Sequence, residues 1–443
     1  MPKPITDPHD HALSGASQAA AAEYAIALDA FNYFHGDPVS ALKRALKDAP
    51  RFVMAHVFKA YLFGLATETG TTKMARGFVE EARALPMTDR EASHIAALDH
   101  LLAGNWTRAA HHLDRHLMEW PRDILALQAG HNIDFFRADA RDLRDRVARL
   151  LPDWDESLPG YSSVLGMYAF GLEEAGDYGR AEAFGREAVA RDARDSWAHH
   201  AVTHVLEMEG RASDGVDWMH ARKGYWAHEA SFFAVHNWWH LALFHLDLEA
   251  VDGALAVYDE ELAKSDDPMA LNLLDASALL WRLTLGGTDP GNRWHALADM
   301  WDTHAPATGY AFNEWHAAMA WLGSGRMDRL DETLAAMAAG NGSEAAGWSR
   351  GVGTELINGF AAFWQGDYVR AVDILHPARQ ISGQFGGSHA QRDVIDWTLT
   401  EAAIRGKMPG VATALAHERL ALKPHSPINR EFLTRAEDIA PAA

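Results

Sequence analysis

The sequence predicts an all-α fold, an α-solenoid of about eleven consecutive helix pairs. A glycine followed five residues later by an alanine recurs along the 443 residues, as in GDPVSA, GNWTRA and GDYVRA. Gly36, Gly70 and Gly104 are spaced by 34 residues, a length that fits two short helices and their turns. No segment alternates between apolar and polar residues with hairpin dipeptides at its ends, so strands are not expected.

This pattern resembles the tetratricopeptide repeat, in which two antiparallel helices pack through small residues and a proline ends the second helix. The copies are Gly36 with Ala41, Gly70 with Ala75, Gly104 with Ala109, Gly176 with Ala181 and Gly366 with Ala371, and weaker copies are centred near Ala138, Gly210, Glu249, Gly286, Gly325 and Gly406. Pro121 and Pro424 each follow the alanine of a copy by twelve residues. We therefore expect one superhelical array over residues 1–443, with an N-terminal extension at 1–21 and a C-terminal tail at 425–443.

The amino-acid composition excludes several kinds of partner and of chemistry. A formal net charge of -21 repels nucleic acid and anionic lipid headgroups, so neither is expected as a partner. Without cysteine, thiolate chemistry and cysteine-based zinc sites are excluded. The opening residues lack the apolar core of a signal peptide, and no long apolar segment follows, which predicts a cytoplasmic protein. The chain is rich in histidine (25) and tryptophan (16), residues that can line polar pockets.

Helix register indicates where these unusual residues lie. In the tetratricopeptide family, positions 2, 5, 9 and 12 of the first helix line the concave groove, and positions 4, 7, 8 and 11 pack between helices. With Gly210 at position 15, Trp197, His200, His204 and Glu207 face the groove. Later repeats add a second set: His236, Trp239, Asp275, Arg282 and Trp315 on the groove side, and His240 and His316 at position 6, beside it. His389 and Arg392 open the last repeat at a helix N-terminus, where free amides favour an anion.

Several segments also resemble a narrower family. GLEEAGDY, WAHHAVTHVLEMEGR, HNWWHLALFHLD, DASALLWRL, HAAMAWLGSGR and GGSHAQRDV follow one another as in the tetratricopeptide repeat protein 38 family. The resemblance covers most of the chain. It implies the architecture and little about activity.

The predicted function is binding of a small or short organic ligand, with an anionic group, in a His/Trp-rich concave pocket. One alternative is an enzyme, a hydrolase or lyase, with His200, His204, Glu207 and Asp275 as acid/base residues. In another form of that alternative, His200, His204 and His236 bind a divalent metal such as zinc, because histidines four apart on a helix can share one ion. HExxH, G-x-S-x-G, P-loop and dinucleotide motifs are absent. A third reading is a peptide-binding adaptor. The sequence does not indicate an oligomeric state.

Other aromatic residues and histidines have simpler interpretations. Trp238, Trp281 and Trp321 fall at packing positions and are expected in the core. His111, His112, His116 and His417 are expected to be solvated.

Overall fold

The computed structural model describes residues 4–263, 269–304 and 309–439. Its contacts divide the chain into two compact units, which are described separately. Unit 1 is Met1–Val202 with His228–Phe233, and unit 2 is Thr203–Ala227 with Ala234–Ala443. The single array over residues 1–443 stays a prediction.

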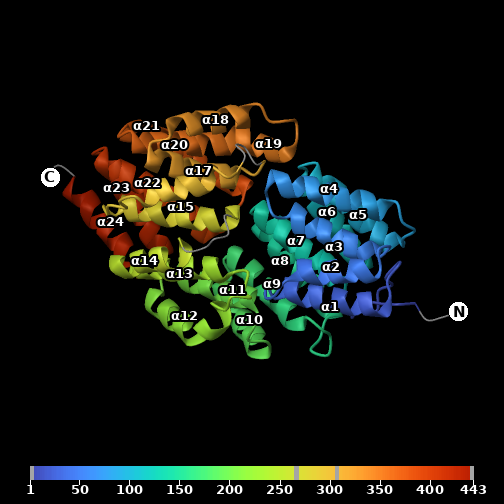
Figure 1. Ribbon diagram of the computed structural model, residues 1–443. Coiled ribbons are helices and arrows are strands. Elements are labelled where there is room, and N and C mark those ends of the chain that lie inside the picture. Colours follow the sequence, from blue (N-terminus) through green and yellow to red (C-terminus); the bar gives the residue numbers. More distant parts are fainter. Residues whose placement is uncertain (1–3, 264–268, 305–308, 440–443) are drawn as a thin grey trace. The chain divides into compact units, whose positions relative to one another are not determined.

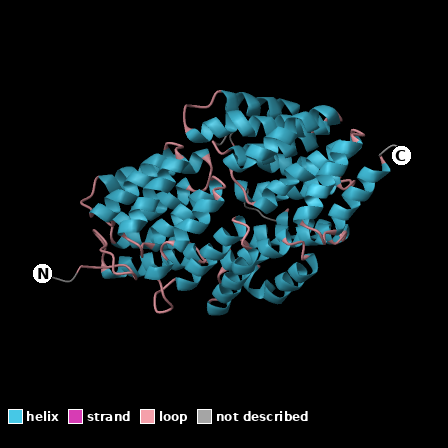
Figure 2. Cartoon of the chain, turned by 180° about the vertical axis from the view of Figure 1, so that it is seen from behind, coloured by secondary structure: helices cyan, strands magenta, loops and turns pink. Residues whose placement is uncertain are grey.

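Both units consist of helices joined by loops (Figure 2). Within the described residues, extended pairing is limited to two isolated bridges, Thr6 with Ala12 and His35 with Ser231. None of the described helices is both long enough and apolar enough to cross a membrane. The predicted all-α fold class is confirmed.

Unit 1 holds five helix pairs (Figure 1). They are α1 (Gln18–Asn32) with α2 (Pro38–Asp48), α3 (Val53–Gly64) with α4 (Thr69–Arg83), α5 (Asp89–Leu102) with α6 (Trp106–Glu119), α7 (Ile124–Phe136) with α8 (Ala140–Ala148), and α9 (Tyr161–Glu174) with α10 (Tyr178–Arg191). The next helix, α11 (Ser196–Met208), begins in unit 1 and ends in unit 2.

Unit 2 continues the series. After α11 and α12 (Ala212–Trp226) come α13 (Ala234–Asp247) with α14 (Val251–Val257), α15 (Ala270–Leu285) with α16 (Arg293–Trp301), α17 (Ala311–Ser324) with α18 (Met327–Ala338), α20 (Thr354–Trp364) with α21 (Tyr368–Ala378), and α22 (His389–Arg405) with α23 (Pro409–Leu422). The short α19 (Glu344–Trp348) is an insertion, and α24 (Pro427–Asp438) lies in the segment predicted as a tail. Among the described residues there are thus eleven pairs, as the repeat pattern predicts.

The repeat pattern marks the turns inside the pairs. Glycines in the left-handed region stand between the paired helices at Gly36, Gly104, Gly176, Gly210, Gly325 and Gly366, and non-glycine residues take that conformation at Ala138 and Glu249. The copy at Gly70 is displaced, because Gly70 lies in the first turn of α4 and Thr67 has the positive φ of 59°. The alanines of the pattern, Ala41, Ala75, Ala109, Ala181 and Ala371, are all fully buried. Small side chains at these positions let the paired backbones approach.

Helices α8 and α9 of unit 1 approach each other closely at Gly171. A Cβ added at Gly171 would lie 2.5 Å from the carbonyl oxygen of Leu143 and 2.7 Å from Cα of Arg144. Both are main-chain atoms, which cannot rotate away. Glycine is therefore required here for packing.

A buried carboxyl group caps the N-terminus of α11 in unit 1. Oδ1 of Asp195 accepts a hydrogen bond from the Ala198 amide at 2.8 Å, whereas Oδ2 is buried and has no hydrogen-bond partner among the described residues. Burial raises the pKa of Asp195 to about 8. The folded chain thus holds a proton here at neutral pH.

We expect Asp195→Asn to flatten the decline of stability with pH. Because the unfolded carboxyl loses its proton near pH 4 and the folded one near pH 8, the free energy of unfolding falls as pH rises between these values. The slope is at most about 1.4 kcal/mol per pH unit for one proton. Urea unfolding from pH 4 to pH 9 measures it. Asparagine keeps the cap and does not titrate, so parallel curves for wild type and variant would contradict the assignment.

In unit 2 the C-terminal helices pack against the middle ones. The Arg282 guanidinium on α15 donates to the Ala390 carbonyl on α22 at 3.0 Å, and the Trp281 indole donates to Thr398 Oγ1 at 2.9 Å. Arg405 of α22 donates to the Leu285 carbonyl at 2.9 Å, and Ser426, before α24, bonds to Asp247 of α13. These contacts cover the inner faces of α13 and α15, which carry most of the predicted site residues.

Candidate functional site

Most of the predicted site residues meet in the interior of unit 2. They are His204 and Glu207 on α11, His236, Trp239 and His240 on α13, Asp275 and Arg282 on α15, and Trp315 and His316 on α17. We predicted a concave groove for them, but all except the half-buried His236 are at most 8% exposed. The reason is the packing of α22 and α24 described above, which turns this part of the predicted groove into a closed interior.

Two histidines are each held by a carboxylate. Nδ1–H of His240 donates to Oε2 of Glu207 at 2.8 Å, and Nδ1–H of His236 donates to Asp275 at 2.9 Å. Burial raises the pKa of Asp275, against the opposing influence of His236. In both pairs the carboxylate sets the imidazole tautomer and its orientation.

The rings of this site pack against one another. His236 stacks on Trp239 with centroids 5.2 Å apart and planes at 15°. His240 lies edge-on to His236 at 4.7 Å and to His204 at 4.6 Å. One ring nitrogen from each of His204, His236 and His240 lies within 4.8 Å of the other two. Three imidazoles therefore converge on one point, bordered by an indole.

Arg282 lies two turns after Asp275 on α15 and extends the site along that helix. Its guanidinium carbon lies 5.4 Å from the Trp239 ring centre, a cation–π distance. Its hydrogen bonds go to the main-chain carbonyls of Ala278 at 3.2 Å and Ala390 at 3.0 Å. Burial lowers the pKa of Arg282 to about 10, so the group stays charged at neutral pH.

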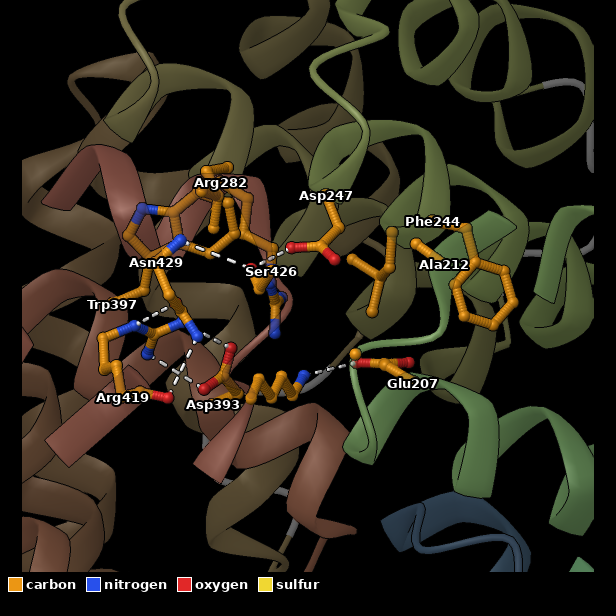
Figure 3. A pocket seen from close by; sticks show the side chains of 14 residues that line it. Glu207, Ala212, Phe244, Asp247, Arg282, Asp393, Trp397, Arg419, Ser426 and Asn429 are labelled. Atoms are coloured by element: carbon orange, nitrogen blue, oxygen red, sulfur yellow. Dashed lines mark hydrogen bonds and ion pairs between the residues drawn. The ribbon is translucent and has the colours of Figure 1, made fainter. Parts of the chain in front are cut away.

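A small pocket with a cavity volume of about 30 Å³, partly open to solvent, borders Arg282 (Figure 3). It is lined by Glu207, Gly210, Ala212, Leu243, Phe244, Asp247, Arg282, Asp393, Trp397, Arg419, Lys423, Ser426, Ile428 and Asn429. Figure 3 shows Arg419 facing Asp393, to which it donates bonds of 3.0 and 3.2 Å. Nζ of Lys423 lies 3.8 Å from Oε1 of Glu207. Burial alone would raise the pKa of Asp393, but Arg419 and Lys423 hold this pKa well below its usual range. The pocket lining thus carries both acidic and basic side chains.

His316 and Trp315 belong to the same core and have a different environment. Nδ1–H of His316 donates to the Phe312 carbonyl at 2.8 Å, and burial lowers the pKa of His316 to about 3. The His316 ring is therefore neutral at physiological pH. The Trp315 ring packs on it at 4.6 Å.

The remaining predicted residues lie elsewhere. Trp197 and His200 belong to unit 1, where the Trp197 indole donates to Nε2 of His131 at 3.0 Å and the His200 ring stacks on Phe170 at 5.5 Å. His389 is exposed at the start of α22. Arg392 bonds to the carbonyls of Gly386 and Gly387, which fixes the turn before α22.

Sequence reasoning missed the C-terminal wall of the pocket. Arg419, Lys423 and Ser426 come from α23 and the turn that follows it. These side chains carry no motif, and their register on α23 does not indicate that the helix faces α11 and α13. The ion pair between Arg419 and Asp393 joins neighbouring helices of one repeat, and only such a local pairing could have been expected.

Unit 1 contains a second cluster of titratable residues around Asp123. Its Oδ2 accepts from His94 Nε2 at 2.9 Å, His116 Nε2 at 3.0 Å and Arg90 Nε at 2.5 Å. Burial lowers the pKa of His94 to about 4. Burial alone would raise the pKa of Asp123, but Arg90 and the imidazoles hold this pKa well below its usual range. The prediction that His116 is solvated is wrong, because its ring turns inward to this carboxylate.

Fold and site together describe an all-α helix-repeat protein with a polar, aromatic interior in unit 2. No protein-family model matches the sequence. Solved structures that it resembles include the APC/C hetero-tetramer Cut9–Hcn1, at a TM-score of 0.45 and 15% identity over 94% of this chain and 76% of that one. The human IFIT1 dimer with PPP-AAAA gives 0.42 and 14% over 88% and 91%. These likenesses are too weak to support conclusions about function, and the resemblance to the tetratricopeptide repeat protein 38 family stays a prediction.

Proposed function

We propose that unit 2 binds a small organic anion at Arg282. The observation that carries this proposal is a buried guanidinium that borders a pocket and forms no ion pair among the described residues. Burying a charge without a paired counter-charge is costly. A carboxylate or phosphate group of a ligand would supply that charge.

The three carboxylates whose charges act on Arg282 already accept hydrogen bonds from other residues. Asp393 accepts two bonds from Arg419, Glu207 accepts from His240, and Asp275 accepts from His236. Each of these groups lowers the electrostatic cost of Arg282 without bonding to it. The guanidinium therefore keeps hydrogen-bonding capacity for a ligand.

The pocket lining includes Leu243, Phe244 and Trp397, which favour a small ligand with an apolar portion. The Nε1–H groups of Trp239 and Trp315 are buried and have no acceptor among the described residues. Such donors favour a polar ligand with acceptor atoms. The buried position of these side chains supports a small molecule in preference to an extended peptide, which needs an accessible groove.

Acid/base catalysis on the bound anion is a second candidate function. Glu207 lines the pocket and also accepts the Nδ1–H of His240, so a carboxylate–imidazole pair reaches the pocket wall. Such a pair can move a proton to or from a bound ligand.

Binding of acetate, succinate, citrate and inorganic phosphate, followed by tryptophan fluorescence and calorimetry, tests the proposed function. We expect at least one of them to bind with 1:1 stoichiometry and Arg282→Met to weaken that binding about 10- to 100-fold, the value of a charge-assisted hydrogen bond. The matched control is Arg293→Met, because Arg293 forms a surface ion pair with Asp259. No binding by any of the four anions, or equal affinity in Arg282→Met, would refute the proposal.

Ligand-dependent stability distinguishes this role from a structural one. If Arg282 serves a ligand, an anion at 100 times its Kd raises the free energy of unfolding of the wild type by about 2.7 kcal/mol and that of Arg282→Met much less. If Arg282 serves only its hydrogen bonds to Ala278 and Ala390, the anion leaves both free energies unchanged.

A further inference from the structure

We propose that unit 2 also holds a zinc ion on His204, His236 and His240. This inference does not rest on the anion site at Arg282. Its first support is the convergence of one ring nitrogen from each imidazole to within 4.8 Å of the others. Ligand nitrogens in a tetrahedral zinc site are about 3.3 Å apart, so small ring rotations would complete the geometry.

The second support is the pair of carboxylates behind the rings. Glu207 and Asp275 each accept the Nδ1–H of one histidine, at 2.8 and 2.9 Å. A metal-binding imidazole commonly donates its other nitrogen in this way, which directs Nε2 to the ion and raises its basicity. Here two histidines of one centre have the same arrangement, and both carboxylates come from helices other than the histidines' own.

Helix spacing gives the third support. His236 and His240 are four residues apart on α13, so that one turn presents both rings on the same side, and His204 is contributed by α11. His200 stands at the same spacing before His204 on α11 but lies in unit 1. The proposal is therefore made for the three histidines of unit 2.

The unit 1 cluster offers a comparison, because a carboxylate and a guanidinium occupy the centre of its histidines. There the Nε2 atoms of His94 and His116 point to Asp123, and the Arg90 guanidinium supplies the positive charge at 2.5 Å. In unit 2 both carboxylates bind Nδ1, and Arg282 bonds to main-chain carbonyls instead. The unit 2 cluster thus brings imidazole nitrogens together, whereas in unit 1 the imidazoles meet a carboxylate that is already paired with a guanidinium.

Donor chemistry selects the ion. Imidazole nitrogens suit zinc and neighbouring transition metals, whereas magnesium and calcium require oxygen ligands. Two outer carboxylates offset the dipositive charge in a buried site. Zinc is the divalent ion that fits three imidazoles with an open fourth position, where water or an anion could bind.

Zinc titration of the full-length protein, after removal of metals with a chelator, tests the proposal. In competition with a chromophoric chelator, we expect one zinc ion per chain. His236→Ala with His240→Ala should weaken binding about 100-fold or more, and Glu207→Gln or Asp275→Asn about 10- to 100-fold. His245→Ala is the matched control, because His245 lies on α13 beyond the three-histidine centre.

Two further measurements keep the proposal falsifiable if a variant does not fold. Cobalt replacing zinc in the wild-type protein should give the visible bands of a four-coordinate nitrogen site. Arg282→Met should keep its zinc affinity, which separates this centre from the anion site. The proposal fails if the wild type binds no zinc stoichiometrically, or if His94→Ala with His116→Ala abolishes zinc binding while the His236 and His240 variant retains it.

Discussion

We expect Asp123→Ala to lower the free energy of unfolding of unit 1 by about 3–5 kcal/mol, the usual cost of removing one partner of a buried ion pair. Asp123 is 1% exposed and accepts bonds from Arg90, His94 and His116 through one oxygen. Its other oxygen accepts the Ala126 amide at 3.1 Å and caps α7. Alanine would leave the buried guanidinium with Asp7, at 3.4 Å, as its remaining ion-pair partner among the described residues. Urea unfolding followed by circular dichroism measures the change.

The matched control for Asp123 is an ion pair on the surface of the same unit. Asp99 binds Arg83 at 2.6 Å, with side-chain exposures of 48% and 50%. Water screens such a pair, so Asp99→Ala should cost less than about 1 kcal/mol. Equal effects at Asp99 and Asp123 would contradict the importance given to the buried network.

The same substitution at two glycines of unit 1 should have opposite effects. Gly171→Ala places a methyl group 2.5 Å from the Leu143 carbonyl oxygen, so α8 and α9 must separate, at a cost of about 3 kcal/mol. Gly77 is exposed in α4, and a Cβ there meets nothing within 4 Å. Gly77→Ala should therefore stabilise the helix by about 0.5–1 kcal/mol.

Thermal and urea unfolding of these two variants measure the difference. No loss of stability at Gly171 would contradict the close approach described for α8 and α9, and a loss at Gly77 would contradict its exposed position in α4. Both glycines lie inside helices, so the gain in helix propensity is common to the two variants and their difference reports on the contact with α8.

The repeat architecture could be predicted because its signals are local. Gly176 turns the chain between α9 and α10, and Ala181 lets the two helices approach, all within one repeat. The displaced copy at Gly70 shows the limit of this signal, since Thr67 adopts the left-handed conformation that glycine was expected to take. A sequence pattern identifies a turn only when the residue type is required by the backbone.

The candidate site could be predicted in part. Register placed His236, Trp239, Asp275 and Arg282 on related helix faces, and the structure brings these four together. Register could not predict that α22 and α24 cover those faces. Their packing depends on contacts between residues more than a hundred positions apart, such as Arg282 with Ala390. Similarly, the inward turn of His116 follows from the position of Asp123 at the start of the next helix, which is a tertiary arrangement.

The course of the chain sets the order in which the protein can be completed during synthesis. Residues 228–233 belong to unit 1, although they follow α12 of unit 2 in the sequence. The Phe34 ring meets the Phe233 ring edge-on, and the Phe232 amide donates to the Phe34 carbonyl at 2.9 Å, so these late residues pack on the beginning of the chain. Domains usually fold as they leave the ribosome, N-terminal part first. Here the N-terminal part must wait for α11 and α12 to be translated, and its aromatic edge around Phe34 stays uncovered until then.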